Sequence, residues 1–218
     1  MLKNRVMLYV ALLGLTTLVG CAAPKPKDYS AFRAADPKTI LILPPKNSSP
    51  DIKATYGVYA QTSRPVAEAG FYVLPITLVD EHFKAQGMTV ADDVHAIDIA
   101  KLREVFGADA ALYIDIKEYG SKYYVIGSAT VVTAEGRLVD LRTGDELWQG
   151  VARASSEEQS QNSGGIAGML ISALVKQVMA AAFDQSYPIA GMTTQRLLSV
   201  QSPGALIPGP RHPAYPKR

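Results

Sequence analysis

The chain of 218 residues contains a single cysteine, Cys21, so no intramolecular disulfide can stabilise its fold. Any folded part must be held together by a hydrophobic core, and 48% of the residues are hydrophobic, an ordinary share for a globular protein. Cys21 directly follows a segment in which Lys3 and Arg5 precede an uncharged apolar run over residues 6–19. About 14 residues are too few to cross a bilayer, and this pattern is typical of a secretory signal peptide.

The last four residues of this leader, Leu18-Val19-Gly20-Cys21, resemble a bacterial lipobox. The resemblance predicts cleavage between Gly20 and Cys21 and attachment of acyl chains such as palmitate to Cys21, with no other cofactor. Acylation would also consume a thiol that is otherwise exposed in an oxidising compartment. Two alternatives stay open, an unmodified cysteine after an ordinary cleavage site and an uncleaved leader that acts as the anchor.

The residues after Cys21 bear on localisation and on domain limits. Ala22 and Ala23 resemble the default signal for the outer membrane, because aspartate after the cysteine usually retains such proteins in the inner membrane. We therefore expect a signal peptide over 1–20, a tether over 21–38, one α/β domain over 39–200 and a Pro-rich flexible tail over 201–218. The formal net charge of +2 provides no basic field for binding nucleic acid.

The first half of the predicted domain alternates strands and helices. The runs 39–43 and 71–74 are rich in β-branched or aromatic residues and end at prolines, as buried strands do. Helices are predicted over 54–69, 76–86 and 98–106. This alternation favours a layered α/β arrangement.

The sequence pattern of the second half of the domain is typical of an antiparallel sheet. Strands are predicted over 110–118, 123–134, 137–140 and 147–154, separated by the turns 119–122, 135–136 and 143–145. A strongly apolar helix over 166–183 and a short helix over 193–198 follow. The fold class is therefore α/β (α+β), a single domain with a two-layer or three-layer mixed sheet and helices packed on it.

Two segments are candidates for interaction surfaces. Tyr119, Tyr123 and Tyr124 flank the predicted turn 119–122, so they could form an exposed aromatic binding edge, or they could be ordinary strand residues. The helix 166–183 is apolar on nearly every side and rich in small residues. It could lie at a membrane surface, join copies of the chain into a homo-oligomer, or simply cover one face of the sheet.

No catalytic constellation is evident in the sequence. His82, His95 and His212 lie in separate segments without a spacing suited to a metal, and we predict no metal site. The acidic doublets Asp92-Asp93 and Glu157-Glu158 on predicted loops are the only candidate acids for an enzyme acting on the cell wall. We therefore predict that the protein is not an enzyme.

Several short motifs resemble a family of proteobacterial outer-membrane lipoproteins of unknown function, typified by a neisserial surface lipoprotein. The resemblance implies a domain similar to the N-terminal domain of periplasmic TolB and to curli-type secretion lipoproteins, beside which family members tend to be encoded. The chain lacks the long amphipathic hairpins of those pore proteins, so a pore is not implied. The matching pieces are Ile40-Leu41-Ile42-Leu43-Pro44-Pro45, Ala69-Gly70-Phe71-Tyr72-Val73-Leu74-Pro75, Gly107-Ala108-Asp109-Ala110, Leu138-Val139-Asp140-Leu141 with Gly144, and Leu147-Trp148.

These observations together predict an outer-membrane lipoprotein with a periplasm-facing domain. The leading hypothesis is that this domain binds another envelope protein, such as a curli-type secretion lipoprotein, as an accessory of a secretion or assembly complex. The alternative is a cell-wall-directed hydrolase or small-ligand-binding lipoprotein that uses the acidic doublets at 92–93 or 157–158.

Overall fold

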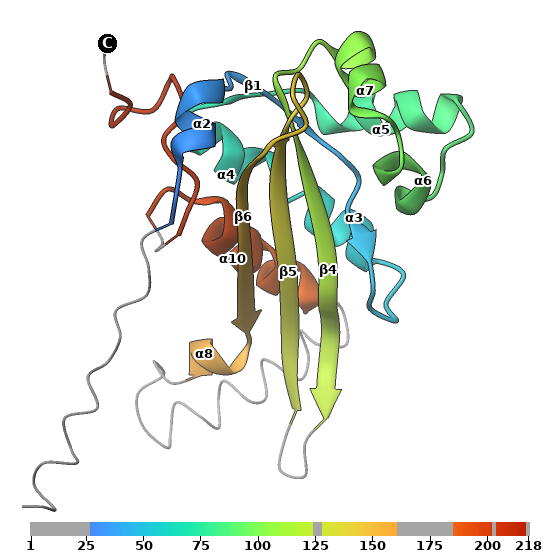
Figure 1. Ribbon diagram of the computed structural model, residues 1–218. Coiled ribbons are helices and arrows are strands. Elements are labelled where there is room, and N and C mark those ends of the chain that lie inside the picture. Colours follow the sequence, from blue (N-terminus) through green and yellow to red (C-terminus); the bar gives the residue numbers. More distant parts are fainter. Residues whose placement is uncertain (1–26, 124–127, 161–184, 202–203, 217–218) are drawn as a thin grey trace, which may run out of the picture.

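The computed structural model describes residues 27–123, 128–160, 185–201 and 204–216 (Figure 1). Six strands form one mixed sheet in the order β3-β1-β4-β5-β6, with β2 paired to β4. Helices pack on the sheet, which is open and not a closed barrel, so the predicted α/β class is confirmed. Within the described ranges, none of the helices has the length and apolar character that crossing a bilayer requires. The strands are β1 (Thr39–Ile42), β2 (Lys46–Asn47), β3 (Tyr72–Val73), β4 (Ala110–Tyr123), β5 (Ser128–Asp140) and β6 (Glu146–Ser155).

The parallel part of the sheet is built around β1, which pairs with β3 on one side and β4 on the other. Pro44 and Pro45 end β1, since proline has no N–H to donate to a neighbouring strand. After this interruption β2 resumes parallel pairing with β4, with Lys46 opposite Asp115. The chain 39–47 therefore runs along one side of β4.

The antiparallel part consists of β4, β5 and β6, and its strands are longer than the sequence predicts. Residues 119–122 are paired strand residues and not a turn, and β5 runs without a break through Gly136. The predicted turns at 119–122 and 135–136 are therefore wrong. Gly136 is needed for close packing, because a Cβ there would lie 3.1 Å from the ring of Trp148. The predicted turn 143–145 between β5 and β6 is confirmed, with Gly144 at a φ of +83°.

Helices cover both faces of the sheet (Figure 1). One face packs against helices from both halves of the chain, and the other packs against three short consecutive helices. The predicted helix 54–69 is divided in two, with a break at residues 60–62. The first face carries α2 (Ser30–Ala35), α3 (Ala54–Tyr59), α4 (Ser63–Glu68) and α10 (Ser186–Leu198), the second carries α5 (Ile76–Ala85), α6 (Ala91–His95) and α7 (Ile99–Phe106), and α8 (Glu157–Ser160) follows β6.

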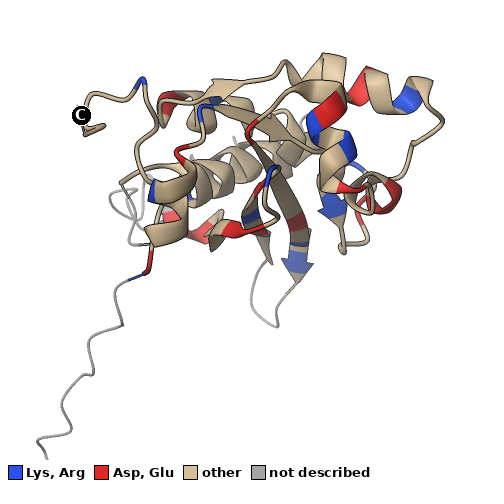
Figure 2. Cartoon of the chain, turned by 45° about the horizontal axis from the view of Figure 1, so that its top comes forward, with Lys and Arg blue, Asp and Glu red and all other residues tan. Residues whose placement is uncertain are grey.

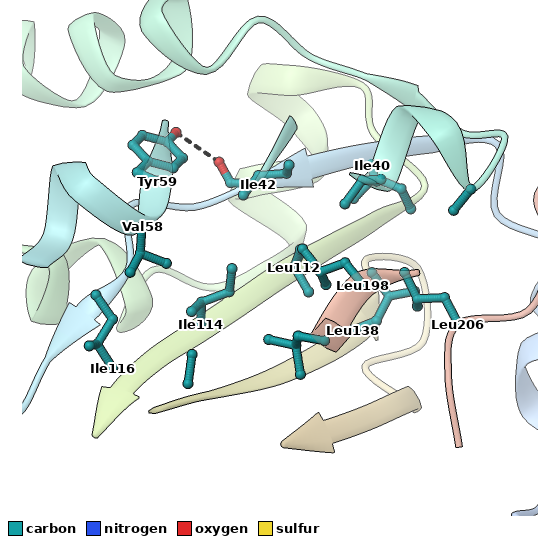
Figure 3. Packing of buried hydrophobic residues seen from close by; sticks show 14 of the residues in the cluster. Ile40, Ile42, Val58, Tyr59, Leu112, Ile114, Ile116, Leu138, Leu198 and Leu206 are labelled. Atoms are coloured by element: carbon teal, nitrogen blue, oxygen red, sulfur yellow. Dashed lines mark hydrogen bonds between the residues drawn. The ribbon is translucent and has the colours of Figure 1, made fainter. Parts of the chain in front are cut away.

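The larger core lies between the sheet and α10, where aliphatic side chains of β1, β4 and β5 meet (Figure 3). Leu198 of α10 and Leu206 of the C-terminal segment close this core over Leu112 and Leu138. The hydroxyl of Tyr59 donates a hydrogen bond to the carbonyl of Ile42 over 2.9 Å. Full burial of each such aliphatic side chain contributes about 1.5–3 kcal/mol to folding.

The folded domain extends beyond the predicted limits of 39–200 at both ends. Phe32 of α2, within the predicted tether, packs on Phe71 with ring centroids 6.2 Å apart. In the predicted flexible tail, the N–H groups of Gly209 and Arg211 donate to the carbonyls of Ala69 and Gly70. Residues 204–216 are thus a packed part of the domain.

Candidate functional site

The predicted tyrosine edge does not exist in the form expected. Tyr119 is buried, with 5% of its surface exposed, because a bulge between Ile116 and Glu118 reverses the alternation of β4. Its ring packs against α3, where a Cβ on Gly57 would lie 2.4 Å from the tyrosine hydroxyl. Tyr119 is therefore a core residue and not part of an exposed binding edge.

The other predicted site residues and the predicted apolar helix lie partly inside and partly outside the residues that the structure describes. Tyr123, at the end of β4, is 85% exposed. Tyr124, the cleavage site at Gly20 and Cys21, and the predicted helix 166–183 lie outside the described residues. Their predicted roles therefore stay predictions.

The two acidic doublets lie in different helices at separate places in the molecule (Figure 1). In α6, Asp92 forms an ion pair with Lys46 over 2.8 Å. In α8, Glu158 pairs with Arg196 over 2.6 Å and also accepts the N–H of Ser155. Hydrogen bonds from these cations lower the pKa of Asp92 and of Glu158, which favours carboxylates and opposes the protonated form that a general acid needs.

No group of three His, Cys, Asp or Glu residues in the described part of the chain could hold a metal ion. The contacts given for His82 and His212 are not those of metal ligands. His82 stacks edge-on against Phe106, and His212 accepts the N–H of Ala214.

Asp109 and Asp140, which belong to the motifs that resemble the family, form hydrogen bonds that connect segments of the fold. Asp109 accepts the N–H groups of Lys38 and Thr39, both over 3.0 Å, and so fixes the start of β1. Asp140 is buried and binds Arg142, whose guanidinium also donates to the carbonyl of Ala35. Burial raises the pKa of Asp140, but hydrogen bonds from Arg142 outweigh it and the net pKa lies below the usual value. These contacts join α2, β1 and the β5–β6 turn.

A groove of about 580 Å³ lies on the outer face of the sheet, and we call it the face groove. His95 donates from Nε2 to the carbonyl of Pro44 over 2.9 Å and stacks edge-on against Tyr113. Burial lowers the pKa of His95, which keeps its ring neutral at pH 7. The guanidinium of Arg137 lies 4.9 Å from the centre of the Tyr113 ring. The groove therefore places two cations, Lys46 and Arg137, and two carboxylates, Asp115 and Glu135, around an aromatic floor.

A second groove, of about 640 Å³, follows the outer edge of β6, and we call it the edge groove. No described strand pairs with this edge of the sheet. Lys27 donates to the carbonyl of Gln149, and Arg196 donates to the carbonyl of Arg153 over 2.8 Å. Between these two cations Val151 is 68% exposed. The edge groove is lined by Lys27, Trp148, Gln149, Gly150, Val151, Ala152, Arg153, Arg196, Leu197, Gly204 and Ala205.

The sequence gives one signal for this groove that our prediction missed. Gln149, Val151 and Arg153 alternate along one face of β6, and an apolar residue between two polar ones on that face is unexpected for a solvated strand. Figure 2 shows Lys and Arg interspersed with Asp and Glu over the described elements, so charge alone does not single out a surface.

An open mixed α/β sheet behind a lipobox-like leader is the arrangement expected of a lipid-anchored domain of the cell envelope. More particularly, the chain belongs to the GNA1162-like lipoprotein family. The model of that family, described as "Putative lipoprotein GNA1162-like", matches residues 27–211. This confirms the family resemblance seen in the sequence motifs, and membership implies a membrane-anchored protein of the envelope.

A protein and a crystal structure from Neisseria meningitidis both match over most of their own length. The "Putative lipoprotein NMB1124/NMB1162" of serogroup B (strain ATCC BAA-335 / MC58) is 42% identical over 206 residues, which is 94% of this chain and 95% of the relative. The crystal structure of lipoprotein GNA1162 is 48% identical, with a TM-score of 0.52, and covers 66% of this chain and 99% of its own. The described fold is therefore similar to one seen by crystallography.

Proposed function

We propose that this protein is an outer-membrane lipoprotein, acylated at Cys21, whose periplasm-facing domain binds another envelope protein. In this role it serves as an accessory of a secretion or assembly complex and is not an enzyme. The observation that carries the proposal is the edge groove, where β6 has no strand neighbour in the described part of the chain and Val151 is 68% exposed. Strand edges left open in this way are used for protein recognition.

The contacts of the acidic residues support a binding role over a hydrolytic one. Asp92 and Glu158 both form ion pairs with cations that lower their pKa. Neither has the raised pKa of a general acid, and the two helices that carry the doublets do not meet.

The test is affinity isolation of the full-length, lipidated protein from envelopes crosslinked in living cells. We expect a second envelope protein to be recovered in stoichiometric amount. As a control, the same isolation with an unrelated outer-membrane lipoprotein should not recover that partner. Recovery of this protein alone, or of itself only, would contradict the proposal.

The face groove favours one further candidate function, binding of a small anionic ligand from the cell wall. The guanidinium of Arg137 lies 4.9 Å from the centre of the Tyr113 ring, and none of the ion pairs among the described residues includes it. Its guanidinium is therefore available to a carboxylate. Thermal denaturation of the full-length protein with muropeptides would show a shift that Arg137→Ala removes and the distant Arg103→Ala keeps. If muropeptides cause no shift, this candidate is excluded.

A further inference from the structure

We propose that the partner binds by adding an extended segment to the outer edge of β6, centred on Val151, and that this segment combines apolar residues with an acidic one. The inference deepens the proposed function and rests on it, since it requires that a protein partner exists. It assigns the edge groove to one kind of occupant, a β-strand from a different envelope protein.

The backbone N–H and C=O groups that an added strand would bond face the open edge of β6, away from β5. The carbonyls of Gln149 and Arg153 point away from β5, because Lys27 and Arg196 donate to them from the open side. In an antiparallel strand the backbone groups of alternate residues point the same way. The N–H and C=O of Val151, midway between the two, therefore also face the open edge.

The surroundings of this edge are apolar on both sides of an added strand. On the α10 side, the indole of Trp148 lies over Gly150 and lines the groove together with Ala152 and Leu197. On the other side, Val151 presents an exposed apolar surface. An incoming strand would place alternate side chains against these two surfaces, which favours apolar residues at both.

The charge at one end of the groove favours an acidic residue in the partner. Lys27 donates to the carbonyls of Gln149 and Gly204, and its Nζ lies 5.1 Å from the centre of the Trp148 ring. Among the described residues, Glu146 is the carboxylate that attracts Lys27 electrostatically, and no ion pair joins the two side chains. A carboxylate on the added strand would meet an ammonium group already held in place, and charge-assisted bonds of this kind are the stronger ones.

The same charges disfavour a second copy of this chain as the occupant. Two-fold antiparallel pairing about Val151 places Gln149 of each copy opposite Arg153 of the other. Lys27, held at Gln149, would then approach Arg153 and Arg196 of the other copy. Like charges brought together across paired strands are destabilising.

A proline at position 151 separates this inference from a general effect on folding. Val151→Pro removes the N–H that an added strand needs. Every N–H of β6 that bonds to β5 is kept, so the domain should still fold. Ala91→Pro, at the first position of α6 where proline is tolerated, is the matched control. Circular dichroism and urea unfolding of both full-length variants verify folding.

Binding is then read by a photoreactive benzoylphenylalanine at Gln149 in full-length, lipidated protein in cells, with a second probe at the exposed Val105 of α7. We expect an adduct from position 149 whose crosslinked peptide contains alternating apolar residues and an acidic one. Its yield should fall about tenfold with Val151→Pro, as loss of one or two hydrogen bonds predicts, and stay unchanged with Ala91→Pro.

Each other outcome has a defined meaning. An adduct at 149 that is insensitive to Val151→Pro, or that joins two copies of this chain, overturns the inference. If crosslinked envelopes yield a stoichiometric partner but only the probe at 105 reaches it, the inference fails while the proposed function stands. If neither probe nor the affinity isolation yields a partner, both fail.

Discussion

At the scale of single residues, a few side chains hold together segments that are distant in sequence. Asp140 is the clearest case, because its carboxylate binds Arg142, which in turn binds the carbonyl of Ala35 in α2. Trp148 is another, since its indole lies against Gly136 and Gly150 and donates to the carbonyl of Gly204. Both residues belong to motifs by which the family is identified in the sequence, so those motifs report on packing.

Replacing Asp140 by Asn should destabilise the protein by about 2 kcal/mol at pH 7, the usual contribution of hydrogen bonds to a charged group. The folded pKa of Asp140 lies below the unfolded value near 3.9. Its contribution is therefore complete above pH 4 and is lost as the pH falls through the folded pKa. Urea unfolding between pH 7 and pH 3 should show a smaller acid destabilisation in Asp140→Asn than in the native protein.

The exposed Glu104→Gln is the control for this experiment, because Glu104 pairs only with the exposed Lys101. Its unfolding midpoint should match that of the native protein at pH 7. A native-like midpoint for Asp140→Asn would show that the contact with Arg142 does not stabilise the fold.

Gly150→Ala should destabilise the domain by about 1–3 kcal/mol through overpacking. A Cβ at this position would lie 2.4 Å from the indole of Trp148, and the ring cannot withdraw because Leu197 and Gly136 lie beside it. Gly191→Ala is the matched control in α10, where the nearest atoms lie at an ordinary 3.5 Å. There alanine should stabilise the helix, by up to about 1 kcal/mol. Thermal denaturation should show a lower unfolding temperature for Gly150→Ala and a higher one for Gly191→Ala, each relative to the native protein.

Tyr119 shows what residue patterns can and cannot predict. The alternation of Tyr113, Asp115 and Lys117 correctly indicates one face of β4, and by that pattern Tyr119 should lie on the same face. The bulge at Lys117 adds one residue to the strand and turns Tyr119 inward instead. Nothing in the local sequence marks this bulge. The tyrosine ring that it turns inward lies beside Gly57, which belongs to another element.

At the scale of elements, the sequence predicts the limits of the short elements in the parallel part of the sheet, but not the lengths of the antiparallel strands. β1 is ended by two prolines, and α7 begins directly after Asp98, which caps the helix by accepting the N–H of Ala100. These are local signals. In β4 and β5, the local sequence at Gly120 and Gly136 predicts turns, although both residues are paired with neighbouring strands. Gly120 is required by its own φ of +116°, whereas the need for Gly136 comes from Trp148 and Leu197, which a local pattern does not contain.

Proline substitutions at adjacent positions of β6 should have opposite results. Val151→Pro should fold, because the N–H of residue 151 faces the open edge, whereas Ala152→Pro should not, because the N–H of residue 152 faces β5. Loss of a ladder bond inside the sheet costs about 3 kcal/mol or more with proline. Soluble expression and circular dichroism are the measurements. If both variants fold, or if only Ala152→Pro folds, the register given for β5 and β6 is incorrect.

The C-terminal segment should behave as a structural element. Leu206→Ala should cost about 2–5 kcal/mol, because Leu206 is buried in the main core beside Ile40, Leu112 and Leu138. Leu78→Ala, with 69% of the leucine exposed, is the control and should have little effect. Equal urea midpoints for the two variants would instead support the flexible tail that composition predicts.

At the scale of the whole molecule, the family and the fold class followed from the sequence, but the edge groove did not. Its lining comes from residue 27, from β6 and from α10 with the segment after it. Lys27 is 122 residues from Gln149 in the sequence, and Arg196 is 43 residues from Arg153. Only the folded sheet brings them together, and only the sheet order shows that β6 has an open edge.

Membrane attachment should depend on Cys21 alone. Cys21→Ser should abolish incorporation of labelled palmitate, because the hydroxyl does not replace the thiol in thioether formation, and should prevent stable anchoring through acyl chains. Fractionation of washed membranes with mass spectrometry of the amino terminus is the measurement. Continued membrane association of an unacylated Cys21→Ser protein would indicate the uncleaved leader as the anchor.

The contact between Lys27 and the carbonyl of Gln149 has a consequence for where this protein can work. Lys27 is six positions after Cys21, and an extended chain of that length reaches about 20 Å. With Cys21 acylated as proposed, the open side of β6 stays within that reach of the lipid surface. The domain then searches for its target in two dimensions, and a segment that emerges close to the same leaflet is met far more often than one deep in the periplasm.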